Sequence, residues 1–215
     1  MKKYRFELRG IMPLIMHADS IEGADSLQEW RKDPRNKGVS VSGDDRTPPW
    51  TWQTYLYHDG TNVVMPAENV MVALRQAGAQ LILKGKKSFK EISQSGLLID
   101  GESCDLTFGK SHLTVADVMS VRDKQFSEQV AFAKKNGFEL FMKRVRIGNA
   151  KHIRVRPKFA QWTVRAEIFV LKQEINDSIL GQLFEIAGKC GLGDWRPASR
   201  TPGCYGQFEA SVSAI

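Results

Sequence analysis

Hydrophobic and polar residues alternate strictly at the start of the chain, where Tyr4, Phe6 and Leu8 face one way and charged residues face the other. A period of two residues predicts a half-buried β-strand. The same alternation returns at 161–171 and at 205–212. These two segments are therefore predicted to be strands of the same kind.

A helical period appears in two places. Apolar residues recur at helical spacing over 67–82, after Pro66, and again after Asn176 and Asp177, either of which can cap a helix. The other predicted elements are strands at 62–65, 96–99 and 138–147, extended chain at 152–156 and a helix at 127–135.

This order of elements predicts an α+β protein. Two β-α-β units folded onto one antiparallel sheet with two helices give the ferredoxin-like, or RRM-like, arrangement. We expect a single such domain, with a long insertion (a thumb) at 17–59 after the first strand and an irregular middle segment at 84–137. The insertion contains Trp30, Trp50 and Trp52, which either close a small satellite core or offer stacking surfaces for bases.

Composition limits the class of protein. Hydrophobic residues make up 42% of the 215 residues, enough for a globular core, and no run of about 18 apolar residues predicts a membrane span. The first residues lack the apolar region of a signal peptide, so we expect a cytoplasmic protein. Cys104, Cys190 and Cys204 are too far apart to indicate a disulfide framework or a zinc site, and no cofactor is indicated. The net charge of +7 favours polyanionic partners.

Much of the positive charge lies between residues 143 and 158, a stretch without any acidic residue. Residues two apart in a strand share a face, so a hairpin across Gly148-Asn149 would form a basic ribbon that contacts phosphates. The alternative is a solvated face whose arginines pair with carboxylates from elsewhere. The predicted nucleic-acid-binding residues of this stretch are Lys143, Arg144, Arg146, Lys151, Arg154, Arg156 and Lys158.

Two further segments are candidates for the same site. In the glycine-rich loop that begins at Gly191, Trp195 offers a stacking plane and Arg196 a fork of donors, although the loop can also serve only to return the chain to the sheet. The junction at Pro66 presents a helix N-terminus that favours an anion, and Arg75 follows in the same helix. We include Trp195, Arg196 and Arg75 among the predicted binding residues.

The histidines give little support for an enzyme. His17, His58, His112 and His152 show no metal-ligand spacing, and no Ser/His/Asp or Cys/His arrangement is discernible. His17, close to Asp19, is the one candidate for general acid–base chemistry. A non-catalytic protein is therefore predicted.

Three pieces of the sequence together resemble the RAMP superfamily, the RNA-recognition-like proteins of CRISPR effector complexes. They are a first strand ending in Gly10-Ile11-Met12-Pro13-Leu14, the junction from Met65-Pro66-Ala67-Glu68-Asn69 to Leu74-Arg75, and the glycine-rich loop from Gly191-Leu192-Gly193 to Gly203-Cys204-Tyr205-Gly206-Gln207-Phe208. The last piece, with its Gly-Leu-Gly-Asp-Trp-Arg-Pro stretch, is also similar to the ending of tailed-bacteriophage proteins. Ala67 and Glu68 depart from the small residues usual in that family.

The resemblance implies a backbone subunit that forms a homo-oligomer or filament along single-stranded RNA or DNA, in a phage or CRISPR context and alongside other effector subunits. The arginine-rich strands and the glycine-rich loop would grip the sugar-phosphate chain, and the insertion would reach a neighbouring subunit or between bases. Two alternatives stay open. One is a metal-independent endoribonuclease of the same superfamily that uses His17, and the other is an assembly protein whose basic face binds an acidic protein.

Overall fold

The computed structural model of the protein describes residues 1–85, 87–108 and 112–215. Its contacts divide the chain into two compact units. The sheet unit comprises the described residues of 1–15, 64–108 and 160–215, and the hairpin unit comprises 16–63 and 112–159. The sequence suggested one domain with an insertion, whereas here the insertion joins the later half of the irregular middle and the basic strands in a unit of its own.

The sheet unit consists of a sheet, a small hairpin and three helices. Its elements are β1 (Lys2–Gly10), β2 (Leu14–Ile15), β3 (Met65–Pro66), α2 (Ala67–Gln80), β4 (Ile82–Lys84), β5 (Lys87–Ser88), α3 (Lys90–Gly96), β6 (Leu97–Ile99), β7 (Ser103–Thr107), β10 (Thr163–Val170), α6 (Asp177–Cys190) and β11 (Phe208–Ala214).

The main sheet is antiparallel, with the strand order β11-β1-β10-β7-β3. β7 pairs with β10 at residues 163–165 and β6 pairs with it further along, at residues 168–170, so that β6 and β7 act as one interrupted strand. The prediction of an α+β fold with an antiparallel sheet is confirmed. The predicted first strand, the helix at 67–82 and the capped helix after residue 176 correspond to β1, α2 and α6.

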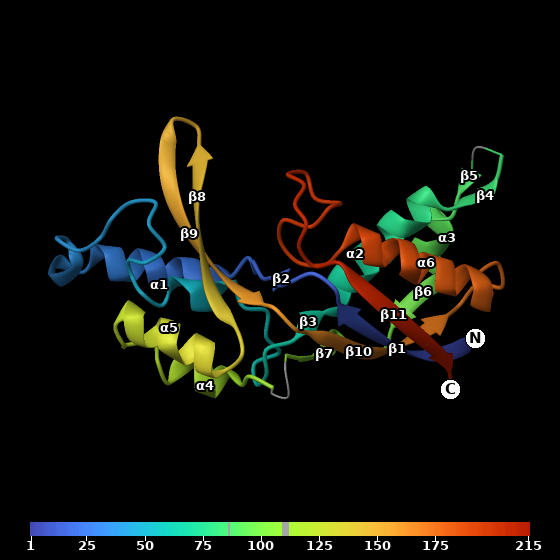
Figure 1. Ribbon diagram of the computed structural model, residues 1–215, viewed down its shortest axis with the longest axis horizontal. Coiled ribbons are helices and arrows are strands. Elements are labelled where there is room, and N and C mark those ends of the chain that lie inside the picture. Colours follow the sequence, from blue (N-terminus) through green and yellow to red (C-terminus); the bar gives the residue numbers. More distant parts are fainter. Residues whose placement is uncertain (86, 109–111) are drawn as a thin grey trace. The chain divides into compact units, whose positions relative to one another are not determined.

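One face of this sheet is covered by α2 and α6 (Figure 1). Tyr4, Phe6 and Leu8 of β1 are buried beneath the helices, as the alternation predicted, and the ring of Phe6 lies 5.2 Å from that of Phe184 in α6. The side chain of Asn176 accepts a hydrogen bond from the backbone N–H of Ile179 and so caps α6.

The other face of the sheet carries charged side chains that neutralise one another. Glu167 in β10 accepts Lys3 at 2.7 Å and Arg5 at 2.9 Å, and Glu7 in β1 accepts Arg165 and Arg9, both at 2.6 Å. Hydrogen bonds from Arg165 and then Arg9 lower the pKa of Glu7, and those from Lys3 and then Arg5 lower the pKa of Glu167. This face therefore presents alternating charges and no uniform positive surface.

The hairpin unit contains short helices and one long hairpin (Figure 1). Its elements are α1 (Ile21–Lys32), the 3-10 helices η1 (Pro34–Asn36) and η2 (Thr51–Tyr55), α4 (Val115–Met119), α5 (Phe126–Lys135), β8 (Glu139–Ile147) and β9 (Ala150–Phe159). Periodicity did not predict α1, a mostly polar helix in which none of the side chains is fully buried. Its local signals are the N-cap Ser20, whose hydroxyl accepts the N–H of Gly23, together with Glu22 in the first turn and Arg31 and Lys32 in the last.

Two of the three insertion tryptophans form a satellite core. Trp50 and Trp52 are buried, and the indole N–H of Trp52 donates to Oε1 of Gln129 at 2.6 Å. The ring of Trp52 also lies 5.6 Å from that of Phe138. Trp30 is half-buried on α1. The core interpretation is thus confirmed for Trp50 and Trp52.

None of the helices within the described ranges combines the length and the apolar character that crossing a lipid bilayer requires.

Candidate nucleic-acid interface

The basic stretch folds as the hairpin that the sequence predicted. β8 and β9 are antiparallel and pair continuously from Glu139 opposite Lys158 to Ile147 opposite Ala150. Gly148 and Asn149 form the two-residue turn, and Gly148 has a φ of +58°. A turn of this kind needs a positive φ, which glycine adopts without strain.

The register divides the seven cations between the two faces of the hairpin. Residues directly opposite each other in an antiparallel pair point to the same side. Arg146 is opposite Lys151, and Arg144 lies two residues before Arg146, so these three share one face. Lys143 is opposite Arg154 and shares the other face with Arg156 and Lys158. The hairpin therefore carries two cationic faces in place of the single basic ribbon expected.

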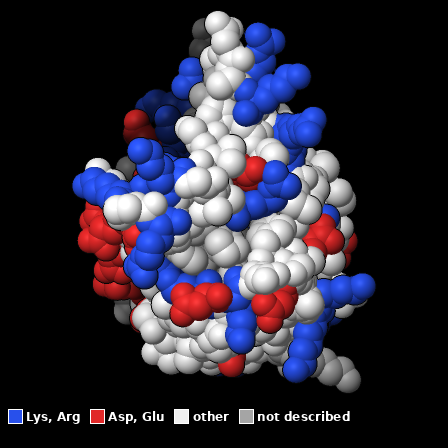
Figure 2. All heavy atoms as spheres, turned by 90° about the vertical axis from the view of Figure 1, so that its left-hand side faces the viewer, with Lys and Arg blue, Asp and Glu red and all other residues white. Residues whose placement is uncertain are grey.

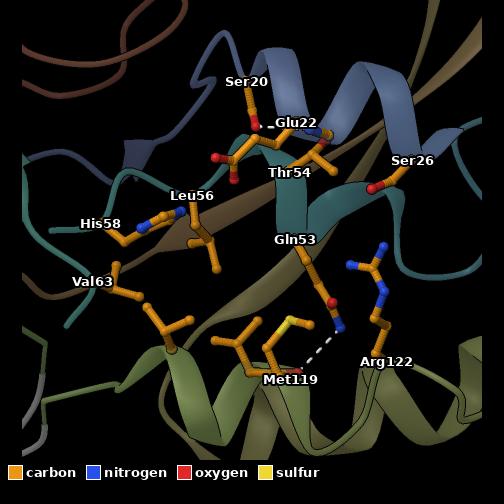
Figure 3. A pocket seen from close by; sticks show the side chains of 13 residues that line it. Ser20, Glu22, Ser26, Gln53, Thr54, Leu56, His58, Val63, Met119 and Arg122 are labelled. Carbon is orange, nitrogen blue, oxygen red and sulfur yellow. Dashed lines mark hydrogen bonds between the residues drawn. The ribbon is translucent and has the colours of Figure 1, made fainter. Parts of the chain in front are cut away.

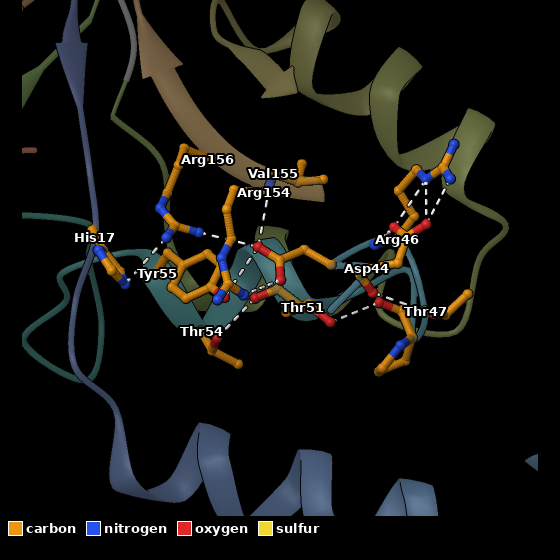
Figure 4. A network of polar contacts seen from close by, with 12 residues as sticks. His17, Asp44, Arg46, Thr47, Thr51, Thr54, Tyr55, Arg154, Val155 and Arg156 are labelled. Carbon is orange, nitrogen blue, oxygen red and sulfur yellow. Dashed lines mark hydrogen bonds and ion pairs between the residues drawn. The ribbon is translucent and has the colours of Figure 1, made fainter. Parts of the chain in front are cut away.

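Near the base of the hairpin, Asp45 holds Arg154 and Arg156, the two arginines of β9 that Figure 4 labels. Its Oδ1 accepts Nη1 of Arg154 at 2.9 Å, and its Oδ2 accepts Nη1 of Arg156 at 3.1 Å. The same Oδ2 accepts the backbone N–H of Val155 at 3.1 Å and the hydroxyl of Tyr55 at 3.2 Å. The basic stretch has no acidic residue of its own, but the insertion supplies one.

Arg156 is part of the protein interior. Only 4% of it is exposed, and its guanidinium stacks on the ring of Tyr55 at 4.0 Å from the centroid. Its Nη2 lies 3.3 Å from Nε2 of His17, and the His17 ring meets that of Tyr55 edge-on (Figure 4). A guanidinium in this position contributes to packing and fixes the geometry of β9.

The loop that carries Asp45 is held against β9 by the backbone. The N–H of Ile153 donates to the carbonyl of Gly43 at 2.8 Å, and the N–H of Asp45 donates to the carbonyl of Ile153 at 3.0 Å. Next to it, Asp44 forms a two-pronged ion pair with Arg46, and hydrogen bonds from that guanidinium lower the pKa of Asp44. Gly43 has a φ of +76°, and a Cβ there would lie 2.2 Å from Nδ1 of His152. The close approach of the loop to the hairpin thus requires a glycine.

Toward the turn the cations have a different environment. Arg144, Arg146 and Lys151 are exposed, and the Nε of Arg146 donates to the carbonyl of Gly148 at 3.1 Å. Within the described residues, no carboxylate pairs with any of these three side chains. Figure 2 shows basic side chains gathered along the projecting hairpin. We call Arg144, Arg146 and Lys151 the tip cluster.

The remaining two cations of the stretch lie on the face opposite the tip cluster. Lys158 forms an ion pair with Glu139 across the strands and lies over the ring of Phe141. Lys143 is exposed, and Arg154 on the neighbouring strand is about three-quarters covered, with 26% of its side chain exposed. Acidic partners thus accompany the cations on this face.

The glycine-rich loop uses its backbone donors internally. The N–H of Leu192 donates to Gly206, that of Asp194 to Ile15 and that of Gly206 to Pro13. A Cβ on Gly206 would lie 1.8 Å from the carbonyl oxygen of Leu192, so close packing accounts for this glycine. These contacts favour the structural interpretation of the loop.

The other predicted residues of the sheet unit are half-buried. Trp195 has a φ of +49°, and its ring lies 6.4 Å from that of Tyr205. Arg196 donates from Nη1 to the carbonyl of Gly193 at 2.9 Å. Arg75 lies in α2, whose neighbouring Gln76 contacts the carbonyl of Ala198 in the loop. Trp195, Arg196 and Arg75 belong to the sheet unit, and the basic strands belong to the hairpin unit.

In the part of the chain that the structure describes, no group of His, Cys, Asp and Glu is arranged to hold a metal ion. Cys104 and Cys190 are buried and Cys204 is exposed, all as free thiols. Burial raises the pKa of Cys104 to about 12, which keeps that thiol protonated.

Comparison with known proteins finds no family model that matches the chain and no significant match among curated proteins.

Proposed function

We propose that this protein is a non-catalytic, single-stranded nucleic-acid-binding protein whose contact with the phosphate chain is made by the tip cluster. The observation that carries the proposal is the exposure of Arg144, Arg146 and Lys151 on one hairpin face, without a carboxylate partner among the described residues. Guanidinium and ammonium groups without a carboxylate partner are available to pair with the phosphates of an external polyanion.

The contrast with the sheet strengthens this choice of surface. In a typical RRM, aromatic side chains on the open sheet face stack on bases. Here Glu7 and Glu167 neutralise the cations of that face, so it is a poor surface for a polyanion. The hairpin is the better candidate.

The strand order also supports the finer description of the fold that the sequence suggested. Counting β6 and β7 as one interrupted strand, the order β11-β1-β10-β7 corresponds to 4-1-3-2 in a β-α-β-β-α-β chain, which is the ferredoxin-like arrangement. We propose on this basis a RAMP-like subunit, acting in the cytoplasm and assembling as a homo-oligomer along the strand.

The test is a fluorescence-anisotropy titration of labelled single-stranded RNA and DNA at about 50 and 200 mM salt. Wild type is compared with Arg144→Gln/Arg146→Gln. We expect tight binding that weakens with salt, and a roughly tenfold loss in the variant with a salt slope smaller by about 1.4, because two phosphate contacts are removed.

A matched control removes two arginines from the sheet face. Arg5→Gln/Arg9→Gln makes the same change in net charge, but each of these arginines already has a glutamate partner. We expect this variant to bind nearly as tightly as wild type. Equal losses in both variants would mean that only net charge matters, and no binding of wild type to either strand would leave the basic face to a protein partner.

Oligomer formation is tested on the same material. Sedimentation of the protein with strands of increasing length should give complexes whose number of protomers rises with length, as expected for a subunit that lines up along the strand. A single protomer on every length would contradict the filament part of the proposal and leave the binding part intact.

A second candidate is RNA cleavage through His17, for which one contact can be cited. Nε2 of His17 lies 3.3 Å from Nη2 of Arg156, a cation that can favour negative charge developing nearby. Labelled RNA incubated without metal ions would be cut by wild type and spared by His17→Ala. Intact RNA with both proteins would remove this candidate.

A further inference from the structure

The hairpin unit contains a second place for a ligand, away from the tip cluster in sequence. A pocket of about 450 Å³ lies among α1, η2 and α4 (Figure 3). Its volume is within the range of small-molecule sites. No step of the proposed phosphate contact uses it.

The walls of the pocket are largely apolar. Leu56 and Val63 line it from the segment at and after the end of η2, and Val118 and Met119 line it from α4. Leu56, Val63 and Val118 are almost fully buried, whereas 47% of Met119 is exposed. Such walls suit the faces of a flat, apolar ring.

One polar side chain in this wall, that of Gln53, has an oxygen without a hydrogen-bond partner. Gln53, only 7% exposed, reaches from η2 toward α4, and its Nε2 donates to the carbonyl of Val118 at 3.2 Å (Figure 3). Its Oε1 is buried and has no hydrogen-bond partner. The carbonyl of Val118 can only accept, so the amide nitrogen must face it and the oxygen is left over. A buried acceptor without a donor is unfavourable, and a donor from a bound molecule would relieve it.

The same pocket is also lined by a cation. Arg122 follows α4 and lines the same pocket, and its guanidinium stacks over the ring of Trp50 at 4.0 Å from the centroid. Stacking limits the freedom of the guanidinium while leaving its N–H groups in the ring plane able to donate. An anionic group attached to the ligand would find its partner here.

We infer that this pocket binds a nucleobase. A base has two apolar faces for the walls and N–H donors on its edge for Oε1 of Gln53. The phosphate of the nucleotide that carries the base would pair with Arg122. An aliphatic chain would leave the glutamine oxygen unsatisfied, which a site with a buried polar group rejects strongly. An inorganic anion would not use the apolar walls.

The base can belong to a free nucleotide or to a strand held by the hairpin, and only the second source rests on the proposed function. For the first source, the 5′-monophosphates of adenosine, cytidine, guanosine and uridine are titrated calorimetrically into the full chain. Ribose 5-phosphate, which lacks a base, is the control ligand. For the second source, an intact oligonucleotide is compared with the same strand made abasic.

Two variants on α1 form a matched pair. Ser26→Trp places a large ring in the pocket, whereas Gln28→Trp places the same ring on an exposed position that does not line it. Gln53→Met removes the acceptor while keeping a similar volume. Thermal melting of each variant checks that the fold is kept, and Ser26→Trp does not depend on the buried amide.

We expect the wild type to bind nucleotides, or to bind the intact strand more tightly than the abasic one. This affinity or preference should drop about tenfold in Ser26→Trp and Gln53→Met, in line with the value of base stacking, and should persist in Gln28→Trp. Binding of ribose 5-phosphate as tight as that of the nucleotides would overturn the inference, as would the absence of both nucleotide binding and any intact-over-abasic difference. If strands bind with salt sensitivity but without that difference, the pocket inference fails and the proposed function stands. If nucleotides bind and strands do not, the pocket inference stands and the proposed function fails.

Discussion

Arg146 and Arg156 lie on the same hairpin, yet their surroundings have little in common. Arg156 is buried, paired with Asp45 and stacked on Tyr55. Arg146 is exposed near the turn and donates to a backbone carbonyl. Both belong to one basic stretch, and the sequence pattern of that stretch does not distinguish them. The difference therefore shows that local sequence does not decide whether a cation is available to a ligand. A carboxylate from a distant segment decides it.

The physical reason is the balance between desolvation and pairing. Burying a guanidinium is costly unless a carboxylate and further hydrogen bonds compensate, and Asp45 supplies both for the base of the hairpin. The tip cluster stays solvated and needs no such partner. We therefore expect the base to govern stability and the tip to govern binding, and four experiments test this division.

The largest effect is expected from Asp45→Ala. It leaves Arg156 buried without its charge partner, and breaking a buried pair in this way costs about 3–5 kcal/mol. Urea denaturation of the full chain measures the loss, with Asp25→Ala, an exposed carboxylate on α1, as the control. A loss below about 1 kcal/mol would mean that the hairpin base does not depend on this ion pair.

A smaller effect is expected from Tyr55→Phe. This change removes the hydroxyl that donates to Oδ2 of Asp45 at 3.2 Å and keeps the ring under Arg156. The loss in the free energy of unfolding should be about 1 kcal/mol. In a double-mutant cycle the same change should have almost no effect in the Asp45→Ala background. Additive effects would show that the hydroxyl acts independently of the carboxylate.

At acid pH the free energy of unfolding should fall by about 0.5 kcal/mol through loss of the Asp44–Arg46 pair, in the loop that carries Asp45. This is the scale of a partly exposed ion pair. The pKa of Asp44 is lowered in the folded protein, chiefly by hydrogen bonds from Arg46. Its contribution is therefore complete above the ordinary aspartate value of about 3.9 and is lost as pH falls through the lower folded value. Denaturation of wild type and Asp44→Asn between about pH 6 and 3 should converge at the acid end. A constant difference would contradict this.

The smallest effect on stability is expected at the tip. The free energy of unfolding of the variant Arg144→Gln/Arg146→Gln/Lys151→Gln should lie within about 0.5 kcal/mol of that of wild type, because exposed side chains away from the core contribute little. For the same variant, the slope of log affinity for single strands against log salt concentration should be smaller by about 2, because three phosphate contacts are removed. Strong destabilisation without a change in binding would reverse the assignment of tip and base.

Patterns in the sequence were sufficient for several of the regular elements. The alternation at Tyr4, Phe6 and Leu8 predicted β1, and the helical spacing after Pro66 predicted α2, because in both cases one face is buried and the other is wet. The turn at Gly148-Asn149 could be predicted because the two-residue turn of a hairpin has specific backbone requirements. α1 escaped detection because it is mostly polar and none of its side chains is fully buried.

Sequence by itself therefore determined the class of fold, the order of its main elements, the hairpin and the identity of its cations. Tertiary structure alone decided which of those cations are committed to the protein, since Asp45 lies 109 residues before Arg154 in the chain and no periodicity links the two. It also decided that Gln53, Val118 and Arg122 line one pocket. Periodicity reports burial along one element, whereas pairing and pockets depend on contacts between elements far apart in sequence, which a local pattern does not encode.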